Sequence, residues 1–351
     1  MKSNILCALP AVFAAFSLTA CDNAFSEKAK TAQAADSTIK TAAKDTLQAP
    51  LSNEPAAIVV DSASFFEKSK YVANGDSSGR WPVASTLPVA GAILPYKRVI
   101  AYYGNLYSTR MGILGELPPP QMRAKLQEEV KKWEAADPNT PVQPALHYIA
   151  VTAQGSPGKG GKYRLRMPFS QIDSVLNMAK PINAIVFLDI QVGLSNLQEE
   201  IPLLEKYLAM PNVHLGIDPE FSMKTGAKPG SRIGTFDAAD VNYAADYLAN
   251  LVKKNNLPAK MLILHRFTRA MLTNIDAIKL RPEVQMVVHM DGWGAPARKI
   301  NTYRQFVAKE PVEFTGFKLF YKNDLKETPG RMMTPEELMK LKPMPMYIQY
   351  Q

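Results

Sequence analysis

The sequence predicts a (β/α)8 barrel over residues 96–351, and three observations lead to this fold class. Eight short apolar runs, rich in Val, Ile, Leu, Phe and Tyr, follow one another after residue 97. Longer stretches with helical periodicity separate them, which is typical of a parallel sheet built from strand–helix units. The region has roughly the 250 residues usual for such a barrel. A doubly wound open sheet allows the same alternation, but eight units with a last strand at the C-terminus favour closure.

The expected strands are Val99 to Gly104, Ala145 to Val151, Ala184 to Gln191, Val213 to Phe221, Met261 to Phe267, Gln285 to Asp291, Thr315 to Tyr321 and Met346 to Tyr350. Helix signals lie between them. Met122, Leu126, Val130 and Trp133 form one apolar stripe after a run of three prolines. Ser195 with Gln198 predicts a capping box, Asp237 begins a long helix, and Thr334 with Pro335 predicts another helix start.

The N-terminus predicts export. Lys2 precedes an apolar stretch from Ile5 to Leu18, too short to span a bilayer as a mature helix, and small residues lead into Cys21. This order resembles the lipobox of bacterial lipoproteins. The resemblance implies a signal peptide over residues 1–20, a lipid such as palmitate on Cys21, and a protein anchored to a membrane of the bacterial envelope, facing the periplasm or exterior. Asp22 resembles an inner-membrane retention signal, although the choice of membrane stays open, as do an uncleaved anchor and an ordinary signal peptide.

Residues 21–61 are rich in Ala, Ser, Thr, Lys and Asp without a sustained period, which predicts a flexible tether. Residues 62–95 are expected to form an N-terminal extension that packs on the barrel through Trp81 and the run from Leu87 to Leu94. The chain has 2 Cys, and Cys7 would leave with the signal. No disulfide and no thiolate metal site is therefore expected.

The formal net charge of +9 favours an anionic partner. In a bacterial envelope this indicates an anionic polysaccharide, peptidoglycan or lipid headgroups, and the compartment argues against nucleic acid. The loop from Gly155 to Lys162 resembles a phosphate cradle but lacks the Ser or Thr and the helix of a P-loop, so a basic hairpin at the barrel mouth is expected. Other basic residues placed at the same face are Arg110, Lys224, Lys228, Arg232, Arg266, Arg269, Arg298 and Lys322.

Polar side chains gather at the carboxyl ends of the expected strands, where barrels of this kind carry their active sites. They are Tyr103, Asn105, His147, Asp189, Gln191, Asp218, Glu220, His265, His289, Asp291, Lys318, Tyr321 and Gln349, with Trp293 following the sixth strand. Charged groups are costly to bury unless they are paired. We therefore expect a functional pocket at this end. His214 lies at the other end of its strand and is expected to be structural.

Asp218 and Glu220 end the fourth strand, two residues apart, so alternation is expected to direct both to one side together with Gly216. The pair resembles the Asp-x-Glu of chitinase-type barrels and Chalaropsis-type muramidases. The run from Met290 to Trp293 loosely resembles a strand-end motif of chitinase-type enzymes. These resemblances imply that Glu220 is the general acid and that Asp218 orients an N-acetyl group. If the chain is a glycosidase, Asp189 or Asp291 is the expected second acid. Gly216 replaces the further acid of chitinase-type sites.

The chain also resembles a group of uncharacterised secreted bacterial barrel proteins, through Gly216 to Glu220 and His289 to Gly294. The favoured interpretation is a glycoside-hydrolase-like enzyme acting on an envelope or extracellular glycan, with catalytic Glu220, Asp218, Asp189 and Asp291, the other mouth residues binding substrate, and neither metal nor other cofactor. Two alternatives stay open. One is a non-catalytic lipoprotein that binds an anionic glycan or a protein. The other is a metal-dependent hydrolase using His265 and His289 with carboxylates.

Overall fold

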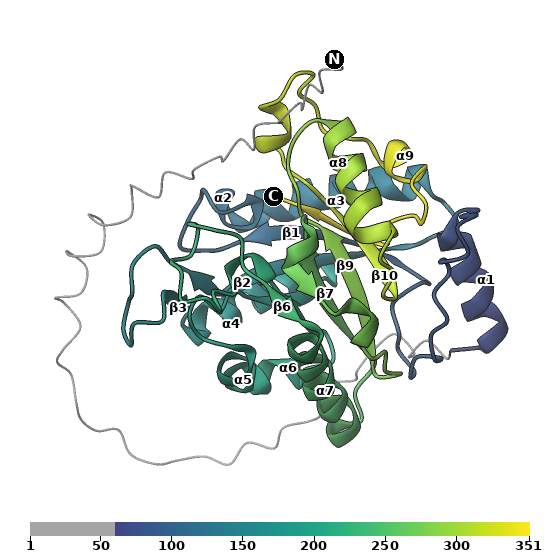
Figure 1. Cartoon of the computed structure of the whole chain (residues 1–351). Coiled ribbons are helices and arrows are strands. Elements are labelled where there is room, and N and C mark those ends of the chain that lie inside the picture. The colour runs from purple at the N-terminus through teal and green to yellow at the C-terminus, as the bar shows by residue number, and fades with distance from the viewer. Residues whose placement is uncertain (1–59) are drawn as a thin grey trace, which may run out of the picture. The chain divides into compact units, whose positions relative to one another are not determined.

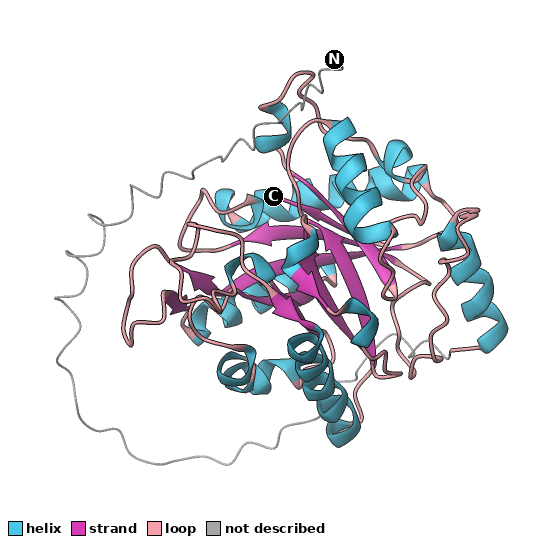
Figure 2. Ribbon diagram, in the orientation of Figure 1, coloured by secondary structure: helices cyan, strands magenta, loops and turns pink. Residues whose placement is uncertain are grey.

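A computed structural model describes residues 60–351. The predicted signal peptide and Cys21, and almost all of the predicted tether, lie outside the described residues. Eight parallel strands close into a barrel, because β1 pairs with both β11 and β2. The strands stand at the centre with helices around them (Figures 1 and 2). They are β1 (Arg98–Gly104), β2 (Val142–Ala153), β4 (Ile185–Ile190), β5 (Val213–Ile217), β7 (Lys260–Arg266), β9 (Val284–Met290), β10 (Phe314–Leu319) and β11 (Tyr347–Tyr350).

The predicted (β/α)8 barrel is thereby confirmed. Three short strands lie outside the closed ring: β3 (Arg164–Arg166) pairs antiparallel with β2, and β6 (Phe236–Asp237) pairs with β8 (Leu272–Thr273). The α-helices are α1 (Ser62–Ala73), α2 (Ile113–Glu116), α3 (Pro119–Ala136), α4 (Phe169–Ala179), α5 (Leu197–Glu200), α6 (Glu205–Leu208), α7 (Ala238–Asn255), α8 (Pro296–Tyr303) and α9 (Pro335–Leu338).

Local sequence signals explain where several helices begin. Asp237 caps α7, and its side chain accepts a hydrogen bond from the backbone N–H of Ala239. Thr334 caps α9 as predicted, and it forms a capping box with Glu337. The predicted box of Ser195 with Gln198 is wrong, because Asn196 is the cap of α5 and accepts from the backbone N–H of Glu199. Asn competes well with Ser for this position.

Hydrophobic residues pack in two regions, one on each side of the strands. The predicted stripe of α3 is buried against the outer face of the barrel. Inside the barrel, a second cluster gathers residues near the amino ends of the strands, including Val99, Ala101 and Phe187. Phe65 and Val72 of α1 and Leu94 belong to this same cluster. Residues 62–95 therefore close the amino end of the barrel interior.

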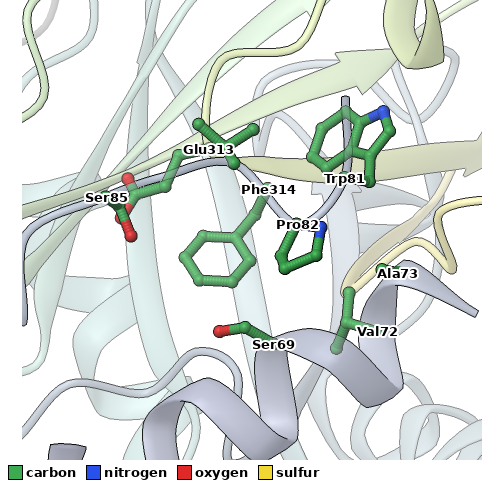
Figure 3. Close-up of a pocket in the computed structure, with 9 residues that line it drawn as sticks. Ser69, Val72, Ala73, Trp81, Pro82, Ser85, Glu313 and Phe314 are labelled. Carbon is green, nitrogen blue, oxygen red and sulfur yellow. The ribbon is translucent and has the colours of Figure 1, made fainter. Parts of the chain in front are cut away.

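A small cavity of about 10 Å³ lies between α1, the segment from Trp81 to Ser85 and the start of β10 (Figure 3). This volume admits at most one water molecule. Glu313 and Phe314 line it from the barrel side. The cavity is a packing gap rather than a place for a ligand.

Candidate active site

The candidate site is a polar layer inside the barrel, directly above the apolar cluster of the interior. Alternate strand residues face inward, and two residues beyond Ala101, Ala145, Phe187, Ile263 and Val287 stand Tyr103, His147, Asp189, His265 and His289. All of these polar side chains are buried. On each of these five strands a polar residue thus follows an apolar one on the inward face, and the polar groups lie toward the carboxyl end.

Asp189 on β4 lies at the centre of this layer. Its Oδ2 accepts a hydrogen bond of 3.0 Å from the Tyr103 hydroxyl, and its Oδ1 lies 3.2 Å from His147 Nε2 and 3.3 Å from His265 Nε2. Burial raises the pKa of the carboxyl, but the imidazoles of His265 and His147 outweigh it and hold the pKa well below its usual range. Asp189 is therefore an ionised and fully buried group.

His265 joins Asp189 to a second carboxylate. Its Nδ1 lies 2.8 Å from Asp291 Oδ2, and the Lys318 ammonium lies 2.8 Å from Asp291 Oδ1. Burial lowers the pKa of His265, but the two carboxylates outweigh it and raise the pKa to about 10. Burial likewise raises the pKa of Asp291, while Lys318 and His265 hold it below its ordinary value. The four groups form a chain of alternating charge.

The other two histidines of the layer stay neutral. Burial lowers the pKa of His147 to about 4 although Asp189 opposes the change, and its Nδ1 lies 2.6 Å from the Tyr347 hydroxyl. Burial also holds the pKa of His289 well below its usual value, and neither of its ring nitrogens has a hydrogen-bond partner among the described residues. Gln349 donates to the same Tyr347 hydroxyl at 2.9 Å.

The structure corrects the predicted course of the fourth strand. β5 ends at Ile217, and Pro219–Phe221 turns into a short 3-10 helix. Asp218 caps this turn, with Oδ1 accepting a 3.0 Å hydrogen bond from the backbone N–H of Glu220. Strand alternation therefore does not apply between Asp218 and Glu220, because proline and a side-chain cap begin a different backbone conformation.

Asp218 and Glu220 nevertheless reach the polar layer. Gln191 donates a 3.3 Å hydrogen bond to Asp218 Oδ2. Burial raises the pKa of Asp218 to about 7, with His265 opposing and Asp189 adding to the increase. Burial raises the pKa of Glu220 to about 8, aided by repulsion from Asp218 and Asp291. Glu220 is partly exposed, whereas Asp218 is buried. Of the two carboxyl groups, that of Glu220 is therefore the more accessible to solvent.

Three of the predicted site residues lie outside this network. Asn105 braces a turn, since its amide donates to the Ile149 carbonyl and its Oδ1 accepts from the backbone N–H of Tyr107. The Tyr321 hydroxyl contacts the hydroxyl of Tyr102 and donates to the carboxylate of Glu129 on the outer face of the barrel. Trp293 is a partly exposed loop residue. The remaining predicted residues converge.

Two residues of the site, Tyr347 and Gly216, were not predicted to contact the polar side chains. Tyr347 faces inward on β11 and contacts His147, and its spacing of two from Gln349 is the signal that would have placed it there. His214 behaves as expected: its Nδ1 accepts a 3.0 Å hydrogen bond from the backbone N–H of Met261, within the apolar half of the interior.

Several of the predicted basic residues are already paired with acids. Arg266 is fully buried, forms an ion pair with Glu310 and donates to the Phe306 carbonyl, so its placement among the basic residues exposed at the barrel mouth was wrong. Lys224, Arg298 and Lys322 pair with Asp240, Glu327 and Glu116. Residues 154–163 form the hairpin between β2 and β3, with the backbone N–H of Gln154 bonded to the Tyr163 carbonyl.

A larger cavity of about 340 Å³ lies outside the barrel, between β2, α4 and the segment from Glu200 to Leu204. Its lining is mostly apolar, with Arg166 and Glu200 paired at its border. It is separate from the polar layer, because the β2 residues that line it, Ala150 and Val151, pack with the outer hydrophobic cluster.

The chain matches no protein-family model and none of the curated proteins. Within residues 60–351, no helix combines the length and the hydropathy needed to cross a bilayer. The class of molecule is therefore defined by the fold and the site alone: a (β/α)8 barrel whose interior carries a buried layer of histidines and carboxylates.

Proposed function

We propose that the chain is a membrane-anchored hydrolase of an envelope glycan, with Glu220 as its general acid. The observation that carries this proposal is the contrast among four carboxyl groups of one site. The pKa of Glu220 is raised to about 8 by burial and by Asp218, whereas cationic neighbours hold Asp189 and Asp291 ionised. Environments that separate pKa values in this way divide a site into a proton donor and charged stabilisers.

Glu220 has the properties that the acid needs. It is protonated at neutral pH and partly exposed, so it can deliver its proton to a glycosidic oxygen as the C–O bond breaks. Its backbone N–H is held by Asp218. The resemblance of this pair to chitinase-type and Chalaropsis-type enzymes supports a role for Asp218 in orienting an N-acetyl group of the substrate.

Asp291 completes the proposed machinery as a stabiliser of positive charge. Lys318 and His265 hold it ionised, and its side chain is 8% exposed, whereas Asp189 is 0% exposed. A substrate at the mouth thus approaches Asp291 more closely than Asp189. A carboxylate in this position favours the oxocarbenium-like charge that develops on the sugar.

The experiment uses the full chain in detergent with purified peptidoglycan and with acidic polysaccharides, and it measures released reducing ends. Glu220→Gln should lower turnover by at least about 10²-fold, because the general acid is lost, while leaving glycan binding unchanged. Glu128→Gln changes an exposed residue of α3 in the same chemical way and should keep full activity.

Full activity of Glu220→Gln on a cleaved substrate would refute the proposed acid. Salt-sensitive binding without any product would instead support the non-catalytic lipoprotein. We favour the hydrolase, because the ion pairs of Lys224, Arg298 and Lys322 reduce the positive charge offered to an acidic polymer.

A further inference from the structure

Three side-chain atoms converge in the polar layer without hydrogen-bond partners among the described residues. They are His147 Nε2 from β2, Asp189 Oδ1 from β4 and His265 Nε2 from β7. Asp189 Oδ1 lies 3.2 Å and 3.3 Å from the two nitrogens, yet none of the three atoms is satisfied by a hydrogen bond. All three side chains are 0% exposed. Buried polar atoms without partners are rare and need an explanation, of which a bound ion or water molecule is one.

The opposite atom of each of these groups is firmly held. His147 Nδ1 lies 2.6 Å from the Tyr347 hydroxyl, and Asp189 Oδ2 accepts from the Tyr103 hydroxyl at 3.0 Å. His265 Nδ1 lies 2.8 Å from Asp291, which is itself paired with Lys318. Metal-ligating histidines and carboxylates are characteristically oriented by such outer contacts, which fix the ring and leave one atom for the ion.

The distances also fit a metal centre. Zn²⁺ binds nitrogen and oxygen at about 2.0–2.1 Å with tetrahedral angles, so two of its ligand atoms lie roughly 3.3 Å apart. The two contacts of Asp189 Oδ1 have this length, and the three donor atoms all lie within 4.8 Å of one another. Direct hydrogen bonds would instead align the N–H with the oxygen.

Gly216 leaves room for the three groups to meet. A Cβ at this position would lie 2.4 Å from Asp189 Oδ1 and 2.5 Å from His147 Nε2. Any residue larger than glycine at position 216 would therefore push Asp189 Oδ1 and His147 Nε2 away from their present positions.

We propose that His147, Asp189 and His265 bind one divalent transition-metal ion, Zn²⁺ or an ion of similar preference, and that the ion displaces the Nε2 proton of His265 to solvent. Two imidazoles and one carboxylate are a donor set of catalytic sites, which keep one coordination position open for water or substrate. His289, whose ring centroid lies 5.1 Å from that of His265, adjoins the site as a further donor. Asp291 lies in a second group with His265 and His289, but its oxygens are engaged by His265 and Lys318.

The proposal does not depend on glycan hydrolysis. The full chain is purified, stripped with a chelator and titrated with Zn²⁺ and Co²⁺. We expect one equivalent to bind with Kd below about 1 µM, a visible Co²⁺ absorption typical of four-coordination, and a higher Tm with the metal, since the ion binds only the folded state. Glu220→Gln should bind metal unchanged, so a failure of the proposed acid and a failure of the metal site remain distinguishable.

Two ligand variants and one outer-contact variant test the residues. His147→Gln and Asp189→Asn should each weaken Zn²⁺ binding at least about 100-fold, and Tyr103→Phe about 10–100-fold. His214→Gln is the matched control, because this buried histidine lies in the apolar half of the interior and glutamine can still accept from Met261. It should keep the affinity of the unaltered protein.

Circular dichroism of the metal-free variants checks that they fold, and if His147→Gln does not, the isosteric Asp189→Asn and Tyr103→Phe carry the test. Absence of Zn²⁺ and Co²⁺ binding by the unaltered chain, or unchanged affinity in a folded Asp189→Asn or Tyr103→Phe variant, overturns the proposal. In that outcome protons on the imidazole nitrogens, rather than a metal ion, join Asp189 to His147 and His265.

Discussion

Gly216 on β5 stands directly beside Asp189 on β4, and a methyl group on Gly216 would lie 2.4 Å from Asp189 Oδ1. The missing side chain explains why the central acid of this barrel comes from β4. A side chain at position 216 and the present positions of Asp189 Oδ1 and His147 Nε2 exclude one another by space.

We expect Gly216→Ala to destabilise the barrel by about 1–3 kcal/mol, the usual cost of overpacking, because neither Asp189 nor His147 can withdraw from a fully buried position. Urea unfolding followed by circular dichroism measures the change. Gly292→Ala is the control, since its added Cβ would meet the nearest side-chain atom at 3.4 Å. Equal stability of the two variants would show that the layer has free space beside Gly216.

The pKa values of Asp218 and Glu220 predict a narrow pH optimum between about 7 and 8. The proposed acid Glu220 is active when protonated, so activity should fall as pH rises through about 8. Asp218 is raised to about 7, and as an acceptor for an N-acetyl group it works when ionised, so activity should rise through that pH. Because the two groups interact, the rising and falling parts of the pH profile report the titration of the pair rather than of either residue alone.

The interaction itself is tested by Asp218→Asn. Repulsion from Asp218 helps to raise the pKa of Glu220, so removing the charge should lower that pKa. Carboxyl ¹³C NMR titration measures it directly and does not require activity. A pKa of Glu220 that stays near 8 in the variant would show that Asp218 does not contribute to the increase.

The site could be predicted reliably where residues lie inside strands, whereas beyond the strand ends Gln191 and Asp291 join the network and Asn105 and Tyr321 do not. Period-two alternation correctly grouped His147, Asp189, His265 and His289, because pleated strands hold side chains on fixed faces. Tyr321 stands three residues after Lys318, so alternation should have placed it on the other face. Asn105 follows the last residue of β1 and braces a turn.

The distances within the layer could not be predicted from the sequence. Asp189 meets His147 and His265 only because the ring of strands closes and sets their relative heights. Whether an imidazole is charged depends on these distances. His265 has two carboxylates beside it, and its pKa is raised to about 10. His147 has only one, and burial lowers its pKa to about 4.

Cys21→Ser tests the proposed anchor. A thioether and an acyl chain require the cysteine sulfur, so the variant should lose palmitate labelling and leave the membrane fraction. One acyl chain binds membranes only marginally, whereas several anchor a protein stably. Cys7→Ser is the control, since Cys7 lies within the expected signal, and this variant should still be labelled. Persistent labelling of Cys21→Ser would contradict lipidation at this residue.

A buried ion pair stabilises the amino end of the barrel. Arg98 and Asp137 lie 2.8 Å apart with exposures of 0% and 1%, and Tyr71 of α1 donates to the same carboxylate at 2.9 Å. Asp137→Asn should cost roughly 3–5 kcal/mol, because it leaves a buried guanidinium uncompensated. Chemical unfolding measures the loss. Glu199→Gln removes an exposed pair with Lys162 and should cost less than about 1 kcal/mol; similar losses in the two variants would contradict the importance of burial.

Glu313, at the small cavity beneath the barrel, predicts a pH-dependent stability that is separate from the candidate site. Burial raises its pKa to about 8, against the pull of a hydrogen bond from the backbone N–H of Met286. The folded state therefore holds a proton that the unfolded state releases near its ordinary pKa of 4.5. Between these two values the unfolded chain binds fewer protons, so stability should decrease as pH rises, by about a few kcal/mol in all.

Glu313→Gln removes the ionisation while keeping an oxygen that can accept from Met286. The variant should match the unaltered chain at pH 4.5 and exceed it in stability at pH 8, because only the carboxyl pays the cost of charging in a buried place. Urea unfolding across this range measures both. Glu128→Gln, on the exposed surface of α3, should leave the pH profile unchanged. A parallel decrease in the unaltered chain and in Glu313→Gln would assign the pH dependence to other groups.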